Sequence, residues 1–352
     1  MIERNIQASE TLAENGKKIA EMATKHFLNN HPDLRDLYGS DSQELWQDHF
    51  SDRVADLSES IALGSSKIFS TNLQWANQAM ASRDLNTDHL QVALQSLKIS
   101  IESLIPQSHV EEVLLCLSEA TKAFMTDTTL AWESELDPSI PLDRLALHYL
   151  QMVIAGNVWA SMQLVIDALD DGFSVKDIFL KVLLPAQTEV GRLWHINQLT
   201  VAEEHLVSAT TERLMAVLAV RANRKSDRGH TAVAASIAGN VHDIGLRAIA
   251  YLMECEGWRT IFLGADMPRS ELPSAVKYFD ADIVLLSVGL TTQLTSLKKT
   301  ISCIREECGS AVKIMIGGNG LKESPSLWQH IGADGYAGDL EEALIKADNL
   351  VT

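Results

Sequence analysis

Residues 239–245, Gly-Asn-Val-His-Asp-Ile-Gly, connect an apolar run at 231–238 to a helix-like segment at 246–255. An apolar strand that leads through a short loop into a helix is typical of parallel α/β folds. A histidine on this loop, followed three residues later by glycine, can place its imidazole over the carboxyl end of the sheet, where such folds hold ligands. His242 is therefore a candidate metal ligand, although most lone loop histidines are solvent-exposed or structurally hydrogen-bonded.

The C-terminal third of the chain has a repeating strand–helix pattern. Apolar stretches at 231–238, 260–263, 283–288 and 313–316 alternate with amphipathic helices, and residues 334–336 would add a short fifth strand. This alternation predicts an α/β doubly wound, flavodoxin-like parallel sheet over 230–352.

The loops after three of these strands carry small and polar residues. Because the carboxyl ends of parallel strands meet at one edge, these loops are expected to share one rim. A large ligand could lay a polar tail into the sheet there while His242 coordinates a metal at its head. The residues concerned are Gly239, Asn240, Asp243, Ile244 and Gly245 in the first loop, Ser287, Gly289, Leu290 and Thr292 in the second, and Gly317 and Gly318 in the third.

The middle of the chain, residues 141–223, reads as helical. Segments 142–169, 174–194 and 200–222 have helical apolar spacing, with Ser174 and Thr200 as predicted N-caps. Three helices cannot bury all their apolar faces, so we expect a fourth helix or another domain to complete a four-helix-bundle-like arrangement. The polar segment 223–229 is a predicted linker.

Residues 1–136 predict an all-α domain of five or six helices, because apolar residues recur there at spacings of three and four. The turn around Pro138 and Pro141 is the expected boundary of this domain.

Composition narrows the classes of function. The net charge of −18 argues against a nucleic-acid-binding surface, which needs clustered cations. No apolar run is long enough for a membrane span, and four scattered cysteines suit a reducing compartment, so a cytoplasmic protein is expected.

The pattern over 230–352 resembles the cobalamin-binding domain with an Asp-x-His-x-x-Gly motif, a serine-containing loop and a Gly-Gly pair. The resemblance implies that His242 is the lower cobalt ligand, displacing the cofactor's own nucleotide base. Asn240 departs from the family, which has an acid there. Its carbonyl can still accept the imidazole Nδ1 proton, without the charge that strengthens donation, or Asp243 can compensate.

The middle segment is similar to the helical cap of adenosylcobalamin-dependent photoreceptors. Trp194, nine further residues and then Glu204-His205 carry this resemblance. It implies that Trp194 covers the upper corrin face beside the adenosyl group, that Glu204 and His205 contact that group, and that His195 binds cobalt after photolysis. The alternatives are a core tryptophan, a solvated Glu-His pair and a surface His195.

The whole layout is similar to the photocobilins, in which a helical domain and a cobalamin module hold biliverdin beside the corrin. Arg35, Arg53 and Arg83 could then pair with bilin propionates, and Cys116 is the only thiol of the domain for a thioether. A dimerisation or packing domain is the alternative.

Three functions follow from these resemblances. The first is a photoreceptor that uses adenosylcobalamin, alone or together with biliverdin, and signals through self-association or an unidentified protein partner. The second is a corrinoid carrier protein for methyl transfer, which needs an exposed upper cobalt face. The third is an interaction protein that has lost cofactor binding, for which Asn240 is the argument.

Overall fold

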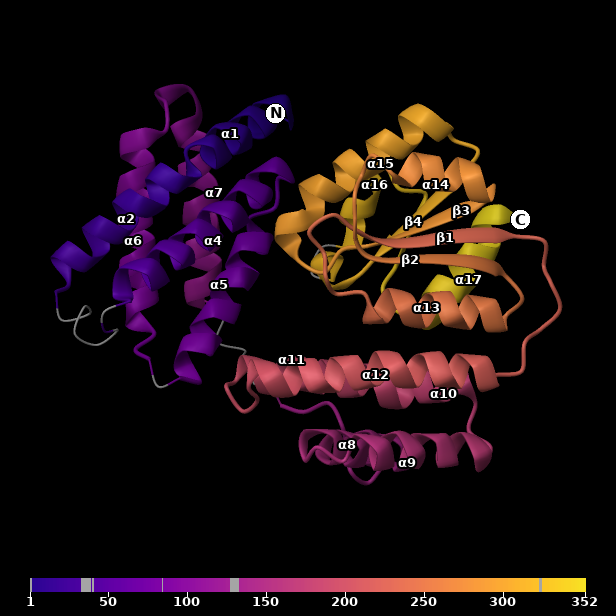
Figure 1. The fold of residues 1–352 in the computed structure, drawn as a ribbon. Coiled ribbons are helices and arrows are strands. Elements are labelled where there is room, and N and C mark those ends of the chain that lie inside the picture. Colours follow the sequence, from indigo (N-terminus) through magenta and orange to yellow (C-terminus); the bar gives the residue numbers. More distant parts are fainter. Residues whose placement is uncertain (1, 33–38, 40, 84, 127–132, 323–324) are drawn as a thin grey trace. The chain divides into compact units, whose positions relative to one another are not determined.

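The computed structural model describes residues 2–32, 39, 41–83, 85–126, 133–322 and 325–352. The chain forms two compact units, Met1–Leu130 and Ala131–Thr352, which are drawn in Figure 1 and treated separately below. Within the described residues, no helix has both the length and the apolar character needed to cross a bilayer.

The first unit is helical, with one apolar core. Phe27 and Trp46 lie at its centre with ring centroids 4.1 Å apart, and Phe50 packs beside them. The prediction of five or six helices is confirmed, since the described part of this unit has six. They are α1 (Ile2–Glu14), α2 (Gly16–Asn30), α4 (Ser42–Ala62), α5 (Ser66–Ala81), α6 (Asp88–Leu104) and α7 (Gln107–Thr126).

A buried polar cluster lies between α4 and α5. Arg53 forms an ion pair with Asp56 (Nη2–Oδ2, 2.8 Å) and donates to the backbone oxygen of Asn72 at 3.1 Å. The Asn72 amide donates to the second Asp56 oxygen at 2.6 Å. Burial raises the pKa of Asp56 and the Arg53 charge opposes that shift.

These contacts revise the predicted bilin partners. Arg53 is buried, and its charge is already paired with Asp56. Its guanidinium is therefore not exposed for an ion pair with a bilin propionate. Burial, helped by Glu119, raises the pKa of Cys116 to about 12, which keeps the thiol protonated and poorly nucleophilic. Arg35 lies outside the described residues.

His49 gives this unit a pH dependence. Burial, and then the neighbouring Arg53 charge, lower the pKa of His49 to about 3, so the folded unit keeps a neutral imidazole. The unfolded chain takes up a proton near pH 6.5, and the folded chain does so only near pH 3. Stability is therefore lost as the pH falls through this window.

We expect His49→Leu to remove much of this acid sensitivity. The free energy of unfolding of the first unit should fall by roughly 2–3 kcal/mol more in the parent than in the variant between pH 7 and pH 4. Calorimetric unfolding of the full chain measures this, with His330→Gln, at an exposed histidine, as the control. Equal pH profiles for parent and His49→Leu would contradict the assignment.

The second unit begins with a bundle of helices. They are α8 (Pro141–Ile154), α9 (Val158–Asp170), α10 (Val175–Ile178), a π-helical turn (Phe179–Leu183), α11 (Leu184–His195) and α12 (Val201–Arg221). The predicted single helix 142–169 is wrong, because the chain reverses at Gly156, where φ is +79°. This break supplies the fourth helix that the three predicted ones needed.

The predicted N-caps of this bundle are confirmed. The Ser174 hydroxyl accepts the backbone N–H of Asp177 at 2.9 Å. Thr200 and Glu203 form a reciprocal capping box, in which the Glu203 carboxylate accepts the Thr200 N–H at 2.8 Å. The Ser174 cap sets where α10 begins, and the Thr200 cap sets where α12 begins. The Thr200 cap therefore also ends the turn between α11 and α12.

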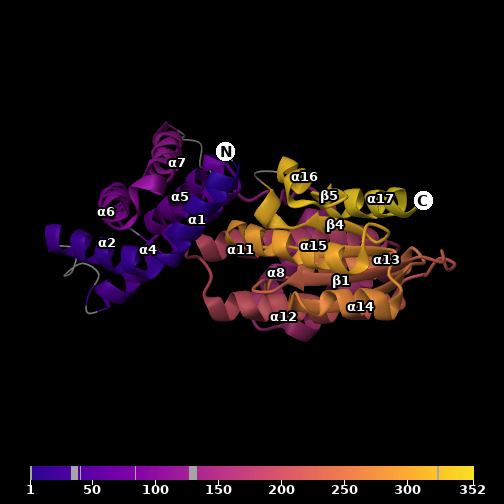
Figure 2. The same ribbon diagram turned by 90° about the horizontal axis from the view of Figure 1, so that it is seen from above.

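The rest of the second unit is a doubly wound α/β layer, as predicted. All strand pairs are parallel, in the order β2-β1-β3-β4-β5. Helices α13 and α17 cover one face, and α14, α15 and α16 cover the other (Figure 1). In Figure 2, α14 and α15 lie side by side over the sheet.

The bounds of this layer lie close to the predicted ones. The strands are β1 (Thr231–Ile237), β2 (Arg259–Met267), β3 (Ile283–Ser287), β4 (Lys313–Gly317) and β5 (Gly335–Ala337). The helices are α13 (Ile244–Cys255), α14 (Leu272–Phe279), α15 (Leu294–Cys308), α16 (Trp328–Ile331) and α17 (Leu340–Val351), with 3₁₀ turns η2 (Thr291–Gln293), η3 (Asn319–Leu321) and η4 (Pro325–Leu327).

The bundle packs on the α13 side of the sheet and shares its core. Ala248, Leu252 and Leu340 of the α/β layer belong to the same buried cluster as the bundle helices. Arg247 of α13 pairs with Asp243 at 3.0 Å and with Glu212 of α12 at 3.4 Å. The bundle and sheet thus form one unit, and a domain division at 223–229 stays a prediction.

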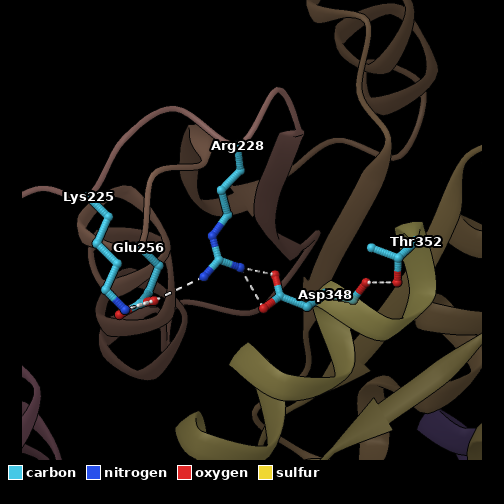
Figure 3. A network of polar contacts seen from close by, with 5 residues as sticks. All are labelled: Lys225, Arg228, Glu256, Asp348 and Thr352. Carbon is cyan, nitrogen blue, oxygen red and sulfur yellow. Dashed lines mark hydrogen bonds and ion pairs between the residues drawn. The ribbon is translucent and has the colours of Figure 1, made fainter.

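The linker between bundle and sheet is fastened by ion pairs (Figure 3). Arg228 contacts Asp348 of α17 at 2.6 Å and Glu256, just after α13, at 3.2 Å. Lys225 shares Glu256 at 2.6 Å, and the Thr352 hydroxyl donates to the Asp348 backbone oxygen. Since Arg228 precedes β1, these contacts lie at the amino edge of the sheet.

We expect Arg247→Met to destabilise the second unit by about 2 kcal/mol, because Asp243 is only 4 % exposed and would lose its ion-pair partner. Adding Asp243→Asn should recover part of the loss. Urea unfolding measures both changes. Arg221→Met, which removes an exposed pair with Asp170, is the matched control and should change stability by less than about 1 kcal/mol. Equal effects of the two arginine substitutions would contradict the role of Arg247.

Candidate cofactor-binding site

His242 lies at the topological switch point of the sheet. Strand β1 pairs with β2 on one side and β3 on the other, and the loops after β1 and β3 therefore flank the point where the winding reverses. In such sheets ligands bind outside the carboxyl ends of the strands at this point. The His242 side chain is exposed there.

The imidazole of His242 lies against the backbone of Gly289, in the loop after β3. A Cβ atom at residue 289 would lie 3.1 Å from His242 Nδ1 and 2.6 Å from Asn240 Oδ1. Any larger residue would push on both side chains. The glycine therefore allows the second loop to support the histidine directly.

Asn240 anchors the His242 loop to β3. Its side chain is fully buried, and its amide donates to the backbone oxygens of Ser287 at 3.1 Å and His242 at 3.4 Å. Its side-chain carbonyl accepts the backbone N–H of His242 at 3.1 Å. The sequence had instead predicted that this oxygen accepts the Nδ1 proton of the imidazole. An aspartate could accept that N–H but could not donate to Ser287, which gives a physical reason for asparagine.

The next residues have structural contacts of their own. Asp243 pairs with Arg247, so it does not supply the charge that Asn240 lacks, as one alternative expected. Ile244 packs against the shared apolar core. Gly245 is exposed in the first turn of α13, and its contact with a cofactor stays a prediction.

The loops after β3 and β4 interlock through their backbones. Val288 donates to Gly317 O at 3.0 Å, and Gly320 donates to Val288 O at 3.1 Å. Gly318 has φ of +103°, and a Cβ there would lie 2.2 Å from Val288 O. Gly318 of the predicted glycine pair is thus required for this approach to Val288, whereas a Cβ at Gly317 would instead lie 3.0 Å from the Ala337 carbonyl oxygen. Ser287 and Thr292 are half-buried on the same rim, and Leu290 is exposed.

The predicted cap residues lie at the turn between α11 and α12. Trp194 is half-buried and packs against the bundle core, and His195 is buried with 1 % exposure, so the alternative of a surface His195 is wrong. Glu204 is hydrogen-bonded to the exposed His205 and accepts the Ser208 hydroxyl at 2.7 Å.

Sequence patterns missed a polar chain that continues from Ser208 into the bundle. Ser208 contacts Gln187 at 3.1 Å, Gln187 donates to Thr211 at 2.7 Å, and Thr211 contacts Tyr149 at 2.9 Å. Burial raises the pKa of Tyr149 to about 12, which keeps its hydroxyl protonated. The four residues lie on three helices, so no local pattern in the sequence indicates such a chain.

Two further residues that the sequence did not single out, Asp266 and Gln293, hydrogen-bond to Gly239 in the His242 loop. The Gly-Ala-Asp-Met-Pro run at the end of β2 is a turn signal that could have drawn attention to Asp266.

The donor set fits a metal that brings most of its own ligands. Among the described residues, no three histidine, cysteine or carboxylate side chains gather as a metal cluster. A protein-held zinc would need three or four such ligands. A single exposed imidazole over a ligand-binding sheet edge instead suits a metal inside a macrocycle.

Two family models match this chain, both described as a B12 binding domain. One covers residues 230–345 and the other covers residues 146–219. The first spans the sheet with the His242 loop, and the second spans the helical bundle. Cobalamin binding by this module, inferred above from the residues, is thereby supported.

Corrinoid proteins of Methanosarcina species are among the proteins similar to this chain. Dimethylamine corrinoid protein 3 of Methanosarcina acetivorans is 33% identical over 118 residues, 33% of this chain and 54% of that protein. Its namesake in Methanosarcina mazei is also 33% identical over 118 residues, which are 69% of that protein. The structure of the Methanosarcina barkeri monomethylamine corrinoid protein aligns with a TM-score of 0.52 at 22% identity, covering 58% of this chain and 98% of that one, which shows the shared fold.

These findings overturn the predicted photoreceptor function. The relatives are named for dimethylamine and monomethylamine, and light sensing has no support among them. The physical reason for the error is that Trp194, Glu204 and His205 mark the ends of two packed helices. That spacing records the turn of the bundle, and does not encode which group lies above a cobalt.

The chain spans about half the length of the first of these relatives and more than two thirds of the second. The shared sequence, the two matched domains and the common fold lead to one assignment. This chain belongs to the family of corrinoid proteins with B12-binding domains.

Proposed function

We propose that this protein is a corrinoid carrier for methyl transfer, serving a partner methyltransferase and having no catalytic centre of its own. The observation that carries the proposal is the exposed His242 imidazole at the switch point of a B12-binding domain, where Asn240 holds the His242 backbone and Gly289 lies against the ring. Relatives named for methylated amines make these compounds the first methyl donors to test.

The residues divide the work of holding the cofactor. When bound, the corrinoid would supply a cobalt able to accept and release a methyl group. His242 would bind the cobalt through its imidazole, while Asn240 anchors the His242 backbone to β3 and Gly289 lies against the ring. The rim around Ser287, Gly317 and Gly318 would receive the polar tail of the cofactor.

The bundle is compatible with a carrier. A Trp194 side chain over the upper corrin face, as the photoreceptor resemblance implied, would argue against methyl transfer because it would obstruct a partner enzyme. The structure weakens that argument, because Trp194 packs against the bundle core as a structural residue. Glu204 and His205, with His205 exposed, are then polar groups available at the bundle surface.

The test is corrinoid binding followed by methylation in darkness. We expect the full chain to bind one equivalent of hydroxocobalamin, and His242→Ala to weaken binding by about tenfold or more. His330→Ala, at an exposed histidine on α16, is the control. Absorbance reports corrinoid binding. In protein labelled with ¹⁵N-histidine, the Co(II) electron paramagnetic resonance spectrum reports the imidazole bond as a ¹⁵N doublet, whereas a bond to the cofactor's own base gives a ¹⁴N triplet.

Methyl transfer is measured on the loaded protein after reduction with titanium(III) citrate. The absorbance of methylated corrinoid should appear only when a methylated amine and a methylamine-specific methyltransferase are both present. A loaded protein that stays unmethylated with mono-, di- and trimethylamine and their methyltransferases would refute the carrier proposal.

A further inference from the structure

The loop that carries His242 is hydrogen-bonded to Asp266, at the end of the edge strand β2. The carboxylate of Asp266 accepts the backbone N–H of Gly239 at 2.7 Å. The backbone N–H of Asp266 itself donates to the carbonyl of Asn240 at 3.0 Å. Two hydrogen bonds thus join the end of β2 to the two residues that begin the loop.

A bulge in β2 brings Asp266 to this position. Ala234 of β1 pairs with Phe262, but Ala235 pairs with Gly264 and Ile237 with Met267, so β2 contains extra residues opposite the end of β1. Bulges of this kind often re-aim a side chain beside a functional site.

The backbone of Asp266 is strained at this bulge. Its φ is +51°, in the left-handed region, which costs a residue with a side chain on the order of 1 kcal/mol. Such conformations persist where surrounding contacts hold them, and they cluster at ligand clamps. The two hydrogen bonds to the loop are the contacts that hold this one.

Gln293 grips the same loop from the opposite side. Its amide N–H donates to the carbonyl of Gly239 at 2.8 Å. Its side-chain oxygen accepts the backbone N–H groups of Gly289 at 3.2 Å and Leu290 at 3.0 Å. One side chain therefore links the loops after β1 and β3 across the switch point.

Together these contacts leave the start of the loop little freedom. Both backbone polar groups of Gly239 are used, the N–H by Asp266 and the carbonyl by Gln293. The side chain of Asn240 is held by β3 as well. His242 follows Asn240 by only two residues. The hydrogen bonds of Asp266 and Gln293 to Gly239, here called the clamp, therefore limit where the His242 imidazole can lie.

We propose that Asp266 and Gln293 are positioning residues that hold the His242 imidazole where it can bind cobalt, an inference that rests on the proposed function. Neither residue touches the metal. Both act through the Gly239–Asn240 backbone, Asp266 from the end of β2 and Gln293 from the 3₁₀ turn η2 that follows β3.

The first test needs no cofactor. Asp266→Gly removes the carboxylate and relieves the strained φ, so loss of the clamp is not confused with general destabilisation. Asp266→Asn keeps an acceptor and tolerates the left-handed region. Asp280→Gly is the matched control, because Asp280 also has a positive φ (+53°) but ends α14.

We expect the Gly239 amide of the full chain to exchange with deuterium about tenfold faster in Asp266→Gly than in the parent. Asp266→Asn and Asp280→Gly should resemble the parent. Gln293→Met, which keeps the length of the side chain, should instead speed exchange of the Leu290 amide. Parent-like exchange in both Asp266→Gly and Gln293→Met would overturn the clamp.

The second test loads the same variants, labelled with ¹⁵N-histidine, with hydroxocobalamin and reduces them to Co(II), so that imidazole splitting is distinguished from splitting by the cofactor's own base. The fraction of cobalt with imidazole nitrogen splitting should fall below half in Asp266→Gly and return in Asp266→Asn, with corrinoid affinity lowered about tenfold. Parent-like splitting in Asp266→Gly, with splitting lost in His242→Ala, would overturn the positioning role and leave the proposed function intact. A parent that binds no corrinoid would overturn both.

Discussion

The hydrogen bond from the buried Asn240 amide to the Ser287 carbonyl is the contact on which the candidate site depends. It joins the ends of β1 and β3 at the point where the sheet reverses its winding. A buried amide without this partner would cost about 1–3 kcal/mol, so the loop has one strongly preferred conformation. Two further sets of contacts form only in this conformation: the contact of Gly289 with the His242 ring, and the hydrogen bonds of Asp266 and Gln293 to Gly239. The exposed imidazole can therefore stand on a rigid support, as a useful metal ligand requires.

The helical bundle is joined to this support through α13. Arg247 lies one turn after Asp243 and bridges it to Glu212 of the bundle, so the residue beside His242 belongs to the same ion-pair network as α12. The shared apolar core makes the same connection, since Leu252 of α13 packs among bundle residues. A displacement of α12 would thus change the contacts of the segment that begins directly after His242. This coupling requires no contact between the bundle and the imidazole itself.

Much of the fold could be predicted from the sequence because its signals are local. The apolar strands, the capping residues Ser174 and Thr200, and the glycine-bearing loop around His242 each stand within a few residues of the element they define. The break at Gly156 was missed because the apolar spacing continues on both sides of it. Asp266 was missed because its hydrogen-bond partner, Gly239, is 27 positions away in the sequence. The two residues come together only because of a bulge in β2. The assignment to light sensing failed for a related reason: short motifs at helix ends record packing, while function depended on what the whole module shares with its relatives.

The fastened linker has a mechanical consequence. Arg228 and Lys225 tie the chain to α13 and α17 at the amino edge of the sheet, whereas His242 lies at the carboxyl edge, one strand length away. The ion pairs that fasten residues 223–229 and the contacts around His242 are therefore separate groups of interactions at opposite edges of one sheet. A substitution at Arg228 or Lys225 is thus expected to weaken the attachment of the linker and to leave the loop around His242 in place.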